Sequence, residues 1–175
     1  EKDRIESLPL AFVLGYMYCG GDDGAFIIPA RLALPFTLYT LNKYYNETSI
    51  EEAKKLADII IARAVKVVEP GYNEIVKAVR IYYALKNILK DYKANAVTMD
   101  CLSIIFHKTI PTTPCLAFSL LNDEGIPAAC ETDLNSLITM IILKHLTGKP
   151  SFISDPVPDF SKGYLYLSLI HISEP

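Results

Sequence analysis

Apolar residues recur at helical spacing in several segments of this chain, and short apolar segments lie between them. A spacing of three to four residues indicates an amphipathic helix, whereas a short apolar run bounded by turn residues indicates a buried strand. In chain order the pattern predicts helices over residues 50–69 and 73–90, a strand over 96–101, a helix over 114–121, a strand over 127–130 and a helix over 133–147. This alternation predicts an α/β fold with a mainly parallel sheet flanked by helices, arranged as a Rossmann-like layer.

The helix ends carry recognisable signals. Ser49 and Glu52 form a capping box, in which each side chain satisfies a backbone N–H at the helix start, and Pro70 ends the run. Asn73 can cap the second helix, and Gly148 ends the last one. The stripes expected to face the core are Ala53, Leu56, Ile60, Ala64 and Val67, then Ile75, Ala78, Tyr82, Leu85 and Leu89, and finally Leu134, Leu137, Ile138, Ile141 and His145.

The first fifty residues are rich in apolar and aromatic side chains. Residues 11–19 predict a buried strand, and the Gly/Asp-rich residues 20–24 predict a turn, with a spacing that fits neither a calcium loop nor a phosphate-binding loop. Pro29 and Pro35 interrupt the next apolar stretch, so residues 27–41 are expected to mix loop with short helix.

Composition bounds the class of protein. With 51% apolar and 21% charged residues in 175 positions, the chain is expected to be a globular piece of about one domain. No apolar stretch is long enough to cross a bilayer and no leader is visible, so a cytoplasmic protein without membrane contact is expected. The net charge of −3 and the lack of Lys/Arg clusters argue against nucleic acid. The four cysteines lack CxxC spacing, which favours buried reduced thiols over disulfides or a zinc site.

The ends of the chain look non-native. Residues 167–175 read as the translation of a sequencing-library adapter, and the first residue is Glu1. We therefore expect a fragment with three parts: a partial α/β domain over residues 1–148, the start of a C-terminal β-rich domain over 149–166, and an adapter scar over 167–175.

Acidic residues follow both predicted strands of the second half. Asp100 lies at the end of the first strand, while Glu131 and Asp133 lie between the second strand and a helix. The carboxyl ends of parallel strands are where α/β sheets bind ligands. Two carboxylates on one turn can bind Mg²⁺ or Mn²⁺. Equally, Asp133 or Thr132 can serve only as an N-cap, with Glu131 an exposed neighbour.

A family resemblance rests on this acidic turn and its surroundings. The matching segments are residues 114–134 (PCLAFSLLNDEGIPAACETDL), 146–150 (LTGKP) and 152–155 (FISD). They resemble the L-fucose isomerase and L-arabinose isomerase superfamily, and within it the fucose-isomerase-like members, over roughly residues 50–166. The most specific part is the Cys-Glu-Thr-Asp turn before an apolar helix.

The resemblance implies a Mn²⁺-dependent aldose–ketose isomerase, acting on a pentose or 6-deoxyhexose through an enediol, with another divalent cation as an alternative. It places Glu131 and Asp133 on the family's acidic turn and Asp100 at an upstream acidic ligand, all three as metal ligands and catalytic groups. Asp100 can alternatively cap a turn at Ser103. The resemblance also implies a homo-oligomer in the full-length protein.

The family's metal-binding histidine has no good counterpart. His107 lies in the loop after Asp100, and His145 lies late on the last helix, where packing or a helix-end role is expected. Related sequences carry a histidine soon after the segment matching 163–166, so the fragment is expected to be inactive. Two alternatives stay open: a non-catalytic sugar-binding or regulatory relative with the same fold, and a metal-assisted hydrolase or aldolase.

Overall fold

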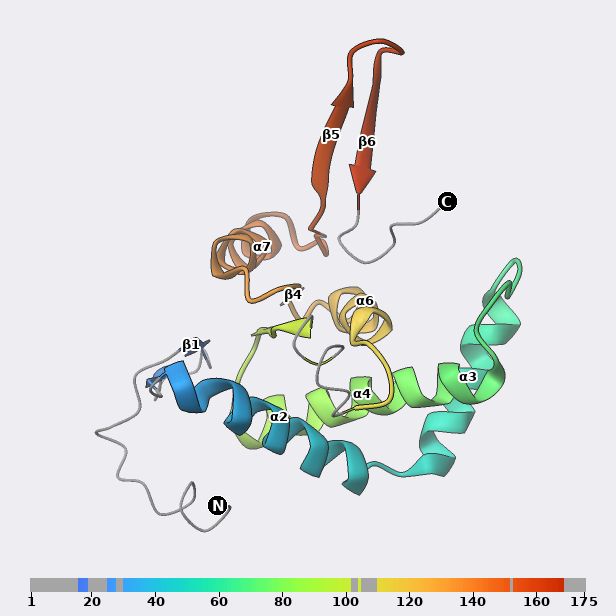
Figure 1. Cartoon of the computed structure of the whole chain (residues 1–175), viewed down its shortest axis with the longest axis vertical. Coiled ribbons are helices and arrows are strands. Elements are labelled where there is room, and N and C mark those ends of the chain that lie inside the picture. The colour runs from blue at the N-terminus through green and yellow to red at the C-terminus, as the bar shows by residue number, and fades with distance from the viewer. Residues whose placement is uncertain are drawn as a thin grey trace.

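The computed structural model describes residues 16–18, 25–27, 30–101, 104, 110–151 and 153–168 (Figure 1). The elements are β1 (Tyr16–Tyr18), β2 (Ala25–Ile27), α2 (Ala30–Glu47), α3 (Ile50–Arg63), α4 (Tyr72–Asp91), β3 (Val97–Thr98), α6 (Cys115–Asp123), β4 (Ala128–Ala129), α7 (Leu134–Thr147), β5 (Asp155–Asp159) and β6 (Tyr164–Ser168). Within these residues the chain is a helix-rich mixed α/β structure, in agreement with the broad fold class predicted.

Helix α4 is the centre of the helical body, because α2, α3 and α6 all pack on it (Figure 1). The largest core cluster joins Leu41 and Tyr45 of α2 with Ile81 and Leu85 of α4 and with Phe118 of α6. A second cluster joins α3 to the start of α4 through Ala53, Ala57, Ile75, Val76 and Val79. The predicted α4 stripe is confirmed at Ile75, Tyr82, Leu85 and Leu89, which are all buried.

Polar contacts also tie α6 to α4. Lys86 Nζ donates to Glu124 Oε2 at 2.9 Å and to the Tyr82 hydroxyl at 3.0 Å. The Tyr82 hydroxyl in turn donates to Glu124. Glu124 follows α6 and precedes β4, so this cluster lies near the amino ends of the strands, opposite the acidic turn.

Strands β3 and β4 form a parallel pair in which Val97 lies opposite Ala128 and Thr98 opposite Ala129. Ala128 belongs to the main core cluster with α4 and α6, whereas Ala129 packs with Leu137 and Met140 of α7. Helices therefore cover both faces of this small sheet. Each strand is two residues long, shorter than the predicted strands over 96–101 and 127–130.

The helix starts follow the sequence signals more closely than the helix ends. Ser49 is the N-cap of α3, and its Oγ accepts from the Glu52 N–H at 3.3 Å, as predicted. The helix then ends at Arg63, before the predicted end, so the predicted core positions Ala64 and Val67 lie beyond it and are exposed. The valine-rich segment that follows has a low helix propensity, and no burial offsets it. Gly71, and not Asn73, is the N-cap of α4.

Two further predictions need correction. The sequence predicts a mixture of loop and short helix over residues 27–41, but α2 is one continuous helix of 18 residues that includes Pro35. Proline costs about 3 kcal/mol inside a helix, and the burial of Leu41 and Tyr45 against α4 offsets this cost. In α7, Leu137 is buried as predicted, but Ile138 is 51% exposed and Met140 is buried in its place.

The C-terminal part of the described chain is an antiparallel hairpin of β5 and β6 that projects from the helical body (Figure 1). Asp159 Oδ1 closes its turn by accepting from the backbone N–H groups of Ser161 at 3.0 Å and Lys162 at 3.2 Å. In the described part of the chain no helix is long and apolar enough to cross a membrane. The strand predicted over 11–19 is described only at β1, and the predicted turn over 20–24 lies outside the described residues.

Candidate functional site

The parallel pairing of β3 and β4 brings the two predicted acidic segments to the same edge of the sheet. Asp100 follows β3, and residues 130–133 follow β4. The Thr132 N–H donates to the Met99 carbonyl at 3.2 Å, so the segments are hydrogen-bonded to each other immediately beyond the strands. The backbone segments that carry Asp100 and the acidic turn are therefore neighbours in the structure.

The acidic turn has an unusual backbone. Glu131 and Thr132 have φ values of 56° and 60°, in the left-handed region. Such conformations cost about 1–3 kcal/mol for residues other than glycine, and β-branched threonine is among the least suited to them. The Asp133 N–H donates to the Cys130 carbonyl at 3.1 Å, and this bond together with that to Met99 holds the turn. Glu131 is half-buried and not fully exposed.

Asp133 is the N-cap of α7, which is the structural alternative to a ligand role for this residue. Its Oδ1 accepts from the Ser136 N–H at 2.9 Å and its Oδ2 from the Ser136 hydroxyl at 2.5 Å. The hydroxyl and the N–H of Ser136 hold the pKa of the Asp133 carboxyl below its usual value. Asp133 is thus ionised at neutral pH, and each of its oxygens already has a partner.

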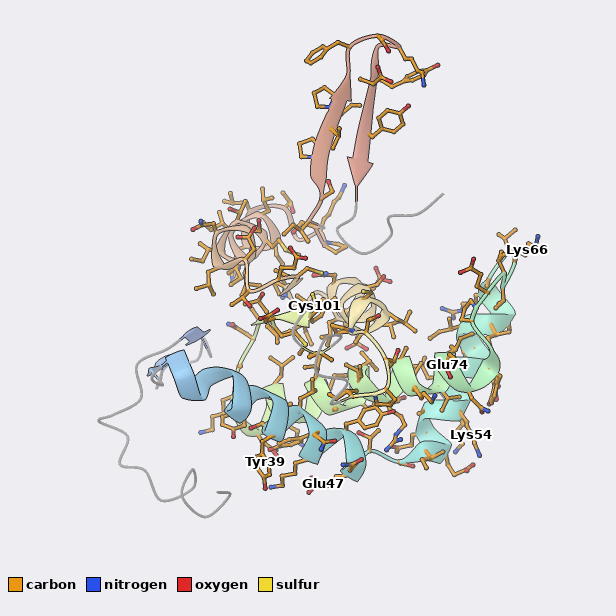
Figure 2. All side chains as sticks on the ribbon, in the orientation of Figure 1. Tyr39, Glu47, Lys54, Lys66, Glu74 and Cys101 are labelled. Atoms are coloured by element: carbon orange, nitrogen blue, oxygen red, sulfur yellow. The ribbon has the colours of Figure 1, made fainter. Side chains whose placement is uncertain are left out.

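Three cysteines from different segments gather beside this turn. Cys101 is fully buried, and Cys115 and Cys130 are half-buried. Figure 2 shows Cys101 beside the β3–β4 sheet and α6. A hydrogen bond to Cys101 and burial raise the pKa of Cys130, and burial raises that of Cys115, so both thiols are protonated at neutral pH. Sequence reasoning placed these residues in the core but did not predict that they meet, while Cys19 lies outside the described residues.

A buried hydroxyl also lies next to the edge. Thr98 is the last residue of β3, and its Oγ1 is buried without a hydrogen-bond partner among the described residues. The Thr98 hydroxyl is not among the site residues predicted from the sequence. A threonine ending a strand just before Asp100 was the available signal, since the carboxyl end of a parallel strand is where ligands are bound.

His145 does not complete the acidic turn. His145 is exposed near the end of α7, where its Nδ1 lies 2.8 Å from the Ile141 carbonyl. The helix rise of about 1.5 Å per residue places it roughly 18 Å along the axis from Asp133. The expected helix-end role agrees with this position, whereas the predicted place of His145 on the core-facing stripe is wrong, because its side chain is exposed. His107 and Ser103 lie outside the described residues.

The three carboxylates have the oxygen donors that a hard divalent cation prefers, but they do not form a complete set of ligands. Oxygen donors are the ligands that Mn²⁺ and Mg²⁺ prefer. However, the described residues contain no group of three His, Cys, Asp or Glu side chains arranged to hold a metal ion. Glu131, Asp133 and Asp100 therefore do not form a complete metal site on their own, and their roles as ligands and catalytic groups remain predictions.

Comparison with known proteins gives one informative match. No known protein-family profile matches the chain. Over 80 residues it is 38% identical to the sulfoquinovose isomerase of Clostridium sp. (strain MSTE9). The match covers 45% of this chain and 17% of that protein, so the chain spans a small part of its relative's length. Because that relative is a sugar isomerase, the match supports the predicted relationship to sugar isomerases at this coarse level.

Proposed function

We propose that this chain is part of an aldose–ketose isomerase that acts on a monosaccharide, a pentose or a 6-deoxyhexose. The observation that carries the proposal is the 38% identity to a sugar isomerase over 80 residues. The position of the acidic turn agrees with it, since Glu131 and Asp100 follow parallel strands at the edge where α/β folds bind ligands. Within the resembling superfamily, the fucose-isomerase-like members are the proposed relatives.

The domain organisation is part of the same proposal. The β3–β4 pair, with α4 and α6 on one face and α7 on the other, supports a Rossmann-like layer within an α/β domain over residues 1–148. The antiparallel β5–β6 hairpin supports a separate β-rich domain that begins in residues 149–166. We further propose a cytoplasmic homo-oligomer that contacts neither nucleic acid nor membrane.

The proposed chemistry is a proton transfer between adjacent sugar carbons. Interconversion of an aldose and a ketose passes through an enediol, and a carboxylate beside the two carbons can take the proton from one and return it to the other. Glu131 is the proposed group, because the strained turn holds it at the sheet edge. Asp100 is the proposed second acid/base group, and Asp133 fixes the turn at the start of α7.

A divalent cation, Mn²⁺ in the first instance, is the proposed cofactor. When bound it would supply positive charge beside the sugar oxygens that become negative in the reaction. Glu131, Asp100 and Asp133 are the proposed ligands from this chain. Because the described residues hold no three-member ligand group, the proposal requires further ligands from elsewhere in the protein.

The test is an isomerase assay on the full-length enzyme that contains this chain, with a panel of aldoses that includes sulfoquinovose and with Mn²⁺ present. We expect Glu131→Gln to lower turnover by about 10²- to 10⁴-fold, the usual range for loss of an acid/base group. Asp133→Asn keeps a good N-cap while removing the charge, and should also abolish Mn²⁺-supported turnover. The matched control is Asp123→Asn, an exposed acid at the end of α6, which should leave turnover unchanged. Undiminished turnover in both Glu131→Gln and Asp133→Asn would overturn the site assignment.

One observation favours a second candidate, a non-catalytic relative that binds a sugar or a regulatory ligand. Both oxygens of Asp133 are engaged by Ser136, which is a structural role that requires no cation. This candidate predicts sugar binding by calorimetry that is independent of Mn²⁺ and is accompanied by no aldose–ketose exchange. Cleavage of the sugar in the same assay would instead indicate a hydrolase or aldolase.

A further inference from the structure

We draw no further inference here: the strongest candidate, the cluster of Cys101, Cys115 and Cys130 beside the acidic turn, belongs to the site already described, and its two half-buried thiols are protonated at neutral pH, so they are not the thiolates that a nucleophilic or redox role requires.

Discussion

At the scale of single residues, the turn after β4 combines two features that oppose each other energetically. Glu131 and Thr132 adopt left-handed backbone conformations, which are unfavourable for residues with a Cβ and worst for a β-branched one. Asp133 then supplies a favourable N-cap to α7. The cap and the bond from Thr132 to Met99 hold a conformation that the local sequence would not choose, which is typical of functional turns.

Thr132→Gly measures the strain directly. Glycine adopts a positive φ without a steric cost, although it also increases the entropy of the unfolded chain. We expect the variant to be more stable than the wild type by up to about 1 kcal/mol in urea denaturation. Thr132→Val retains the β-branch and removes the hydroxyl, so it should show no gain. A destabilised glycine variant beside a neutral valine variant would contradict the strain interpretation.

Asp133→Ala measures the cap. Loss of an N-cap costs about 0.5–2 kcal/mol, and we expect this loss of stability at pH 7. Because Ser136 lowers the pKa of Asp133 in the folded state, the carboxylate stabilises the fold above the pKa of the unfolded chain. The stabilisation is then lost as the pH falls through the lower, folded pKa. Denaturation of both proteins from pH 7 to below pH ~3 should show the difference shrinking, and a difference that grows at low pH would contradict the assignment.

Part of the site was predictable from residue types and order. Asp100 and the acidic turn follow predicted parallel strands, and the strand rule correctly brings their backbones together. The left-handed conformations were not predictable, because neither glutamate nor threonine signals a positive φ. The meeting of Cys101, Cys115 and Cys130 depends on how α6 crosses between the strands, and spacing along the chain does not encode this.

At the scale of elements, most predictions from local chemistry succeeded, although Gly71 and not Asn73 caps α4, whereas predictions that depend on packing failed. The Ser49 N-cap and Gly148, which is left-handed at the end of α7, fixed helix boundaries through backbone hydrogen bonds. The prediction for α2 was wrong at Pro35, because burial against α4 outweighs the free-energy cost of a proline inside a helix. The prediction for α7 was also wrong at Ile138. This residue belongs to an apolar stripe and was expected to face the core, but nothing among the described residues covers it.

The central position of α4 can be tested with two leucines that differ in exposure. Leu85 is 1% exposed in the main core cluster, whereas Leu146 on α7 is 77% exposed. Leu85→Ala should lower the free energy of unfolding by about 2–5 kcal/mol, because it leaves a cavity between helices. Leu146→Ala makes the same chemical change at the surface and should stay within about 0.5 kcal/mol. Equal effects of the two substitutions in urea denaturation would show that α4 is not the centre of the core.

At the scale of the whole molecule, the helical body and the hairpin differ in what stabilises them. The three core clusters draw their buried residues from the helices, from β4, and from segments next to β3 and β4. The hairpin packs chiefly on itself, and Phe160 at its turn is 91% exposed. An isolated two-stranded hairpin is marginally stable in water, so the body should fold independently of it.

Truncation after Ser154 tests this division. The shortened chain retains Ile153, which packs on the α7 cluster, and loses only the hairpin and the residues after it. We expect cooperative thermal unfolding of the helices with a loss of about 1 kcal/mol or less. Truncation after Cys130 is the control, because it removes α7 and with it the burial of Leu137 and Met140, each of which contributes about 1.5–3 kcal/mol. If the chain ending at Ser154 loses its cooperative transition as the control does, the hairpin belongs to the folding unit of the body. In that case the boundary proposed near residue 148 is wrong.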